Sequence, residues 1–151
     1  MDYLYILQQA LVGIITIFWI YNIAISVCSL IKFKEKPLLT NKIHKFMAII
    51  PAHNEEKVIK NLIESLNEQD YPKDKLDIYV IADNCTDATA QIAKDAGAIV
   101  YERTDPTKKT KGYAMQWFLA KMQEQGADYD ALCVFDADNI VDKGFMKAMN
   151  K

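Results

Sequence analysis

The chain has 151 residues, enough for one ordinary domain or for a small domain with an appendage. Its residues are 51% hydrophobic and 25% charged, which is a globular composition rather than that of a disordered or fibrous chain. The formal net charge of −2 provides no basic field to attract nucleic acid, so we expect no nucleic-acid partner.

Residues 3–31 contain no charged side chain. As a helix this stretch would span about 44 Å, more than the roughly 30 Å hydrocarbon core of a bilayer. A cleaved signal peptide would have a shorter apolar region behind a basic start, whereas this start carries Asp2. A buried helix of a soluble protein is a further alternative to a membrane anchor. We predict an uncleaved transmembrane anchor helix over residues 1–31.

A basic linker is predicted over residues 32–45, where Glu35 is outnumbered by Lys32, Lys34, Lys36, Lys42 and Lys45. Positive charge next to a membrane span favours the cytoplasmic side for the part that follows. The three cysteines form no CxxC pair, and their odd number argues against a disulfide framework or a zinc site. We therefore expect a single-pass membrane protein whose soluble part lies in the reducing cytoplasm.

Residues 46–151 alternate between apolar runs and helical patterns. Asn54 is predicted to cap the first helix and Thr86 the second, which should end at Gly97. Pro51 should stop the first strand, and the fourth run leads directly into Asp136 as a fully buried strand. Alternation of this kind predicts an α/β fold, with a mostly parallel sheet covered by helices on both faces. The predicted strands are residues 46–50, 78–82, 98–101 and 131–135, and the later helices begin near residues 113 and 142.

In such sheets ligands bind beyond the carboxyl ends of the strands. Asp136 and Asp138 follow the fourth run, and if strand geometry continues through them, their carboxylates point the same way. Two adjacent carboxylates repel each other unless a cation intervenes, and their oxygens suit Mg²⁺ or Mn²⁺ bridged to phosphate. The alternative is a polar loop in which each Asp caps a turn.

Other polar residues follow the same strand ends. Asp83 could bind a base or ribose, or cap a helix, and Glu55 could bind a ribose or simply favour a helix's first turn. A lone histidine beside a helix start, as His53 is expected to be, is more often structural than catalytic. Lys111, directly before Gly112 and a helix, could screen a diphosphate, whereas Lys108 and Lys109 fit a solvated loop.

Four segments together resemble family 2 glycosyltransferases, the inverting enzymes with the Rossmann-like GT-A fold. They are Ile50-Pro51-Ala52-His53-Asn54-Glu55-Glu56, Ala82-Asp83-Asn84-Cys85-Thr86-Asp87, Lys111-Gly112-Tyr113-Ala114 and Phe135-Asp136-Ala137-Asp138. The resemblance covers about residues 46–150 and keeps the family's order. The family commonly has Gly-Ser where this chain has Asn84-Cys85, and a second acidic residue where it has Ala82.

The resemblance implies a role for each site residue. Ala52, Glu55 and Asp83 would face the nucleoside of a nucleotide diphosphate sugar, and Lys111 would lie near the nucleoside or its diphosphate. Asp136 and Asp138 would form the DxD pair, with Asp138 the more direct ligand of Mn²⁺ or Mg²⁺.

The implied reaction passes the sugar to an acceptor hydroxyl of a polysaccharide or lipid, and we expect the donor to be a UDP-sugar. The family's catalytic base lies well downstream of the DxD, so we expect these residues to form a donor- and metal-binding part of a GT-A domain that lacks the base and is inactive alone. Two other functions stay open: a non-catalytic, membrane-tethered nucleotide-binding module, and a nucleotidyltransferase. A nucleotidyltransferase would normally have a Gly-rich basic loop after the first strand, where this chain has Ala52-His53-Asn54-Glu55-Glu56.

Overall fold

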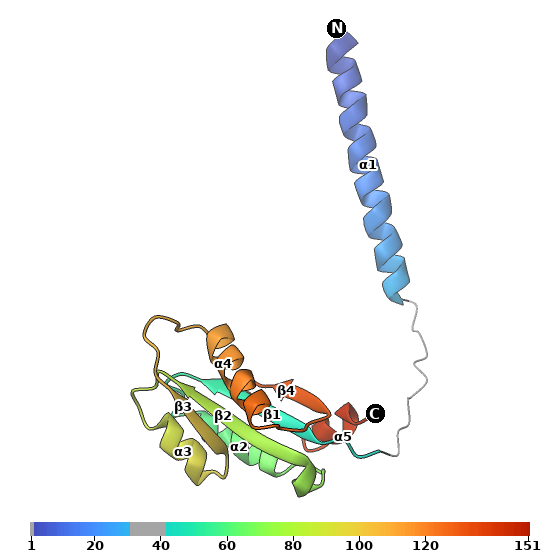
Figure 1. Cartoon of the computed structure of the whole chain (residues 1–151). Helices are drawn as coiled ribbons and strands as arrows, with labels where there is room; N and C mark the ends of the chain where they lie inside the picture. The colour runs from blue at the N-terminus through green and yellow to red at the C-terminus, as the bar shows by residue number, and fades with distance from the viewer. Residues whose placement is uncertain (1, 31–41) are drawn as a thin grey trace. The chain divides into compact units, whose positions relative to one another are not determined.

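The computed structural model describes residues 2–30 and 42–151, which belong to two compact units. The first unit contains one long helix, α1 (Asp2–Leu30) (Figure 1). Among the described residues it is the one helix long and apolar enough to cross a membrane, and its apolar side chains are exposed. Most of the predicted linker, residues 32–41, lies outside the described residues.

The second unit is built on a four-stranded parallel sheet with the strand order β3-β2-β1-β4. Its strands are β1 (Phe46–Ala52), β2 (Leu76–Asp83), β3 (Ile99–Arg103) and β4 (Ala131–Val134). The predicted parallel α/β fold is therefore correct. Strand β1 continues through Pro51, which was expected to stop it. Because β4 pairs with β1 only as far as Ile49, Pro51 lies beyond the stretch that is paired on both sides.

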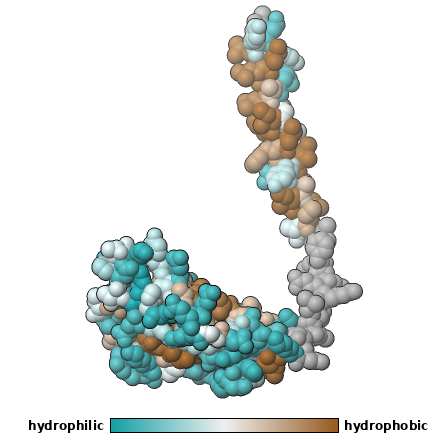
Figure 2. All heavy atoms as spheres, in the orientation of Figure 1, coloured by the Kyte–Doolittle hydropathy of each residue, from teal (hydrophilic) through white to brown (hydrophobic). Residues whose placement is uncertain are grey.

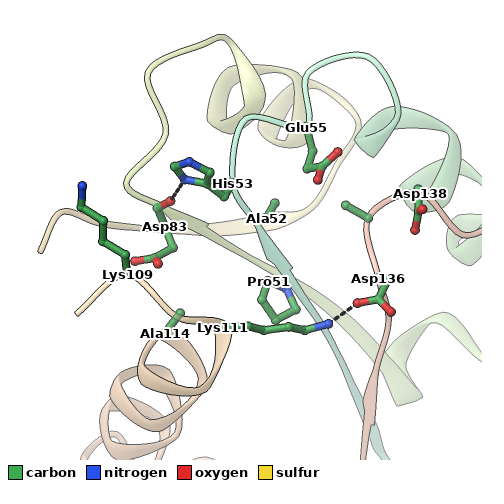
Figure 3. Close-up of a pocket in the computed structure, with 11 residues that line it drawn as sticks. Pro51, Ala52, His53, Glu55, Asp83, Lys109, Lys111, Ala114, Asp136 and Asp138 are labelled. Carbon is green, nitrogen blue, oxygen red and sulfur yellow. Dashed lines mark hydrogen bonds and ion pairs between the residues drawn. The ribbon is translucent and has the colours of Figure 1, made fainter. Parts of the chain in front are cut away.

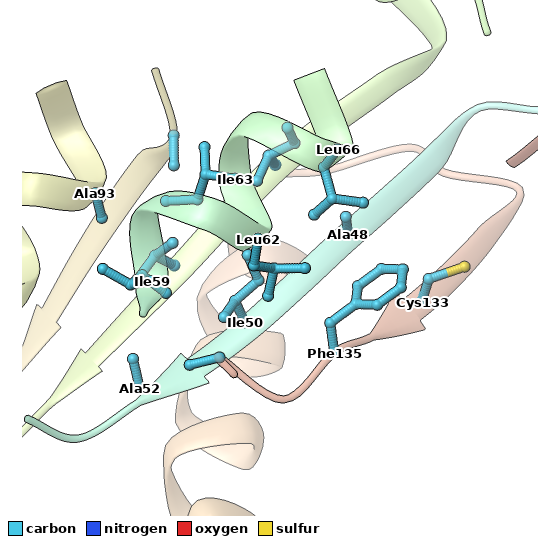
Figure 4. Packing of buried hydrophobic residues seen from close by; sticks show 14 of the residues in the cluster. Ala48, Ile50, Ala52, Ile59, Leu62, Ile63, Leu66, Ala93, Cys133 and Phe135 are labelled. Carbon is cyan, nitrogen blue, oxygen red and sulfur yellow. The ribbon is translucent and has the colours of Figure 1, made fainter. Parts of the chain in front are cut away.

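Helices cover the two faces of the sheet and create two apolar cores. They are α2 (Ile59–Asn67), α3 (Thr89–Asp95), α4 (Lys111–Glu124) and α5 (Phe145–Met149), with a short 3-10 helix over Lys73–Lys75. Ala48 and Ile50 of β1 face α2, as Figure 4 shows, while Met47 and Ile49 pack with α4. Since β1 is buried on both faces, its sequence is continuously apolar rather than alternating.

The expected helix caps at Asn54 and Thr86 are wrong. Helix α2 begins only at Ile59, after a turn, and the residue before α3 is Ala88. The predicted end of α3 is correct: Gly97 has a φ of +92°, and the chain closes a Schellman turn through bonds from Gly97 N to Lys94 O and from Ala98 N to Ala93 O, both 3.0 Å.

Strand β4 is not fully buried, contrary to prediction. Cys133 points into the α2 side of the core, but Leu132 and Val134 on the opposite face are each 50% exposed. Helix α4 packs on β1 and β2, and therefore leaves this face of the edge strand uncovered. Figure 2 shows apolar surface on this unit among mostly hydrophilic residues.

Half-exposed positions on β4 should tolerate polar substitution. We expect Leu132→Thr and Val134→Thr to change the free energy of unfolding by less than about 1 kcal/mol each. The reason is that these two side chains bury little apolar surface when the domain folds. The matched control is Ile49→Thr, since Ile49 pairs with Val134 but is fully buried. That change should cost about 2 kcal/mol or more in a urea titration. Equal losses at Val134 and Ile49 would contradict the uncovered face.

Candidate functional site

A cavity of about 340 Å³ opens at the carboxyl edge of the sheet (Figure 3). Every site residue predicted from the sequence lines it: Ala52, Glu55, Asp83, Lys111, Asp136 and Asp138. The remaining lining residues are Pro51, His53, Lys109, Ala114 and Ala137. Lys109, which the sequence placed in a solvated loop, therefore belongs to the cavity wall, whereas Lys108 does not line this cavity.

The loop after β1 is tied to the loop after β2. Asn54 has a φ of +57°, and its side-chain Oδ1 accepts a hydrogen bond of 2.8 Å from the Thr86 backbone N–H. The Glu55 N–H donates to Thr89 Oγ1 at 2.8 Å, and Thr89 in turn donates its hydroxyl to Asp87. Both polar residues expected to cap their own helices therefore join the two loops instead.

His53 lies at the cavity between β1 and β2. Its ring Nδ1 is 2.7 Å from the backbone carbonyl oxygen of Asp83. Because a carbonyl can only accept, Nδ1 carries the proton in this contact, and the side chain helps hold the end of β2 in place. This geometry agrees with the structural role expected for His53.

Asp83 is the last residue of β2 and is paired in register with Arg103, the last residue of β3. The Arg103 guanidinium donates to Asp83 Oδ1 at 2.5 Å, and the two side chains are only 6% and 8% exposed. The third strand predicted from the sequence ended at residue 101, so this contact of Arg103 was missed. The available signal was its position two residues after the apolar run that ends at Tyr101.

Asn84 follows Asp83 with a φ of +52°, in the left-handed region. Asn enters this region more readily than most residues, and Gly does so most easily. The Asn84 side chain also accepts the Asp105 N–H at 2.8 Å. Asn therefore fits the backbone of a position where family 2 glycosyltransferases commonly have Gly, and adds a hydrogen bond that Gly could not make.

Cys85, beside this turn, is partly buried, and that burial is the main reason the pKa of its thiol is raised. The thiol is therefore protonated at neutral pH and is a weak nucleophile. Hydrogen bonds with the Asn54 backbone and the Thr89 side chain offset only part of the effect of burial, and Cys85 does not line the cavity.

Asp136 and Asp138 lie on a turn rather than on an extended strand. Strand β4 ends at Val134, and the Asn139 N–H donates to the Asp136 carbonyl at 3.0 Å. The condition for the expected shared direction, strand geometry through both residues, is therefore not met, although both side chains line the cavity. Their placement depends on the turn that follows β4.

Lys111 begins α4 and forms an ion pair with Asp136 across the cavity, as Figure 3 shows. Asp138 has no such ion pair among the described residues, and its exposed carboxylate is accessible. One carboxylate is thus neutralised by the protein, while its neighbour is available to an incoming cation.

Two carboxylates suit a divalent cation that also binds a ligand. Within residues 2–30 and 42–151 no group of three or more His, Cys, Asp or Glu side chains is arranged to hold a metal ion. Mg²⁺ is commonly bound by one or two carboxylates together with water and substrate phosphates. Asp136 and Asp138 fit that pattern, in which the ligand and solvent complete the coordination.

Comparison with known proteins agrees with this architecture. Residues 47–150 match the sequence model described as Glycosyl transferase family 2. The probable glycosyltransferase YdaM of Bacillus subtilis is 35% identical over 103 residues, which are 66% of this chain and 24% of that protein.

Solved structures show the same similarity. TarS 1–349 of Staphylococcus aureus matches with a TM-score of 0.58 and 28% identity, over 70% of this chain and 31% of that chain. Glucosyl-3-phosphoglycerate synthase from Mycobacterium tuberculosis matches with a TM-score of 0.52 and 26% identity, over 64% of this chain and 35% of that chain. The chain thus spans about a quarter to a third of the length of these relatives. With its parallel sheet, GT-A-like partial fold and family match, the chain belongs to glycosyltransferase family 2.

Proposed function

We propose that this chain is the donor-binding part of a membrane-anchored glycosyltransferase that uses a UDP-sugar and a divalent metal. The observation that carries the proposal is the cavity of about 340 Å³ at the carboxyl edge of the sheet. It brings together Asp83, Lys111, Asp136 and Asp138 from three separate segments. The full reaction would transfer the sugar to an acceptor hydroxyl of a polysaccharide or lipid.

Each side chain has a role that its position supports. Ala52, Glu55 and Asp83 lie at the ends of β1 and β2 and would bind the nucleoside. Lys111, at the first turn of α4, would offset diphosphate charge together with the helix N-terminus. Asp138, helped by Asp136, would hold Mn²⁺ or Mg²⁺. When bound, the metal would offset the charge that develops on the departing diphosphate.

The ligands of related structures support this choice of donor and metal. TarS 1–349 has been solved with UDP-GlcNAc, and its structure matches this chain with a TM-score of 0.54. Glucosyl-3-phosphoglycerate synthase has been solved with Mn²⁺, UDP and phosphoglyceric acid, with a TM-score of 0.51. A uridine nucleotide together with Mn²⁺ is therefore the first ligand pair to test.

The location proposed for the domain is the cytoplasmic face of a membrane. Support comes from α1, which is long and apolar enough to span a bilayer, and from the basic residues that follow it in the sequence. A domain held in this way would meet cytoplasmic nucleotide sugars and a lipid or polysaccharide acceptor at the membrane.

The test is a titration of the full chain, in detergent micelles, with UDP in the presence and absence of Mn²⁺. We expect Mn²⁺ to tighten UDP binding by about tenfold or more, because the cation bridges a carboxylate and the diphosphate. Asp138→Ala should abolish this enhancement. Asp128→Ala is the matched control, since Asp128 is exposed and does not line the cavity. Binding that is independent of metal and unaffected by Asp138→Ala would refute the metal assignment.

A further inference from the structure

We propose that Arg103 is a positioning residue for the donor: it fixes the Asp83 carboxylate and the loop over residues 104–110 in the geometry that binds the nucleotide. The inference rests on the proposed function and deepens it, because Arg103 acts on the nucleotide through Asp83. Arg103 does not line the cavity that holds the proposed site.

The Arg103 guanidinium is buried and joins two structural elements. Its Nη1 donates to Asp83 Oδ1 at 2.5 Å and to the Lys108 carbonyl at 2.9 Å, while Nη2 donates to Asp105 Oδ2 at 3.0 Å. One planar cation therefore links the end of β2 to two points of the loop between β3 and α4. The fixed fork of donors makes Arg suited to such a junction, whereas Lys carries one compact charge.

The contacts leave one side of the Asp83 carboxylate available. Oδ1 accepts from Arg103 and also from Asn84 Nδ2 at 3.1 Å. Within the described part of the chain, Oδ2 accepts no hydrogen bond. It is also not among the fully buried side-chain atoms that lack a partner, so it remains accessible. Asp83 therefore presents an oriented, unused oxygen at a residue that lines the cavity.

Asp105 extends this arrangement through the loop. Its Oδ1 accepts from the Thr107 hydroxyl at 2.7 Å and from the Thr107 and Lys108 N–H groups at 3.0 and 3.2 Å. The bonds from Thr107, with a smaller effect of the Arg103 charge, lower the pKa of Asp105, so its carboxylate stays ionised at neutral pH. The loop that leads to Lys109 and Lys111 is thus ordered around a charged pair.

A buried ion pair with only a stabilising role could lie at any place in the fold. Here both partners stand at the carboxyl ends of adjacent strands, and the loop they fix carries Lys109 to the cavity and leads into Lys111. Because a well-packed apolar pair can replace many buried ion pairs without loss of stability, the directed contacts indicate a gain other than stability. That gain is a preorganised nucleotide site.

The test compares UDP affinity, at saturating Mn²⁺, among variants of the full chain. Arg103→Gln should weaken UDP binding about tenfold or more, since a charged hydrogen bond orienting the binding carboxylate is lost. Arg103→Lys should recover part of this loss. The matched control is Glu102→Gln, which breaks the exposed ion pair of the neighbouring residue with Lys94 and should bind UDP as wild type does.

A double-mutant cycle separates positioning from general stability. In an Asp83→Asn background, Arg103→Gln should weaken UDP binding by less than about threefold, because the residue through which Arg103 acts has already been altered. An equal loss in both backgrounds would overturn the inference. If Arg103→Gln does not fold, as judged by circular dichroism, the same cycle with Arg103→Lys or Asp105→Asn should show the same non-additivity.

The outcomes also distinguish this inference from the function on which it rests. If the wild-type chain does not bind UDP with Mn²⁺, the proposed function fails. If the wild-type chain binds UDP and the folded Arg103 variants bind it equally well, only the role of Arg103 is refuted.

Discussion

Phe118→Ala is expected to lower the free energy of unfolding by about 3–5 kcal/mol. Phe118 is fully buried on the α4 side of the sheet. Its ring centroid lies 5.3 Å from that of Tyr79 and 5.4 Å from that of Tyr101. Truncation would remove apolar burial and both aromatic contacts, and would leave a void between α4 and β2 that the surrounding strands cannot easily close.

Leu119→Ala provides the matched control for this loss. Leu119 is the next residue of the same helix and is 37% exposed, so its truncation should cost clearly less. Both variants would be compared with wild type by urea denaturation, followed by near-ultraviolet circular dichroism of the aromatic side chains. Similar losses at Phe118 and Leu119 would contradict the assignment of Phe118 to the core.

The second large effect is expected in α1. Ile14→Arg combined with Ile17→Arg should prevent stable membrane integration, because an arginine at the centre of a spanning helix costs about 2.5–3.5 kcal/mol on the insertion scale. Both isoleucines lie near the middle of the helix and are exposed, at 66% and 70%. The proportion of the chain that stays in membranes after alkaline carbonate extraction measures the result.

Position along the helix provides the control for added charge. Tyr3→Arg combined with Ser29→Arg introduces the same two charges close to the helix ends, where long basic side chains reach the interface. This variant should remain in the membrane fraction. Equal extraction of the two double variants would show that α1 does not depend on a bilayer-spanning position.

The strand pattern could be predicted because it depends on short stretches of sequence. A continuous apolar run such as Phe46–Ile50 indicates a strand buried on both faces. The same logic brings the strand ends together, so residues as distant as Asp83 and Asp138 could be expected at one edge before their contacts were known. Their lining of one cavity follows from parallel topology.

The departures from prediction come from contacts between segments that are distant in the chain. Asn54 and Thr86 are residue types that commonly cap helices, but here they form a hydrogen bond that joins two loops. A local sequence pattern does not reveal such a contact. Leu132 and Val134 were expected to be buried because apolar composition does not tell which strand lies at an edge that α4 leaves bare. Arg103 was missed because its acceptors lie on β2 and on a folded loop.

The position of β1 in the sheet has a consequence for synthesis. Of the four described strands, β1 leaves the ribosome first, yet it lies between β2 and β4, and β4 is made only after β2 and β3. One edge of β1 must therefore remain without its partner until Ala131–Val134 has emerged. Because unpaired apolar strands favour misassociation, the nascent domain is most vulnerable to aggregation during that interval. Pauses in translation between β3 and β4 would lengthen it.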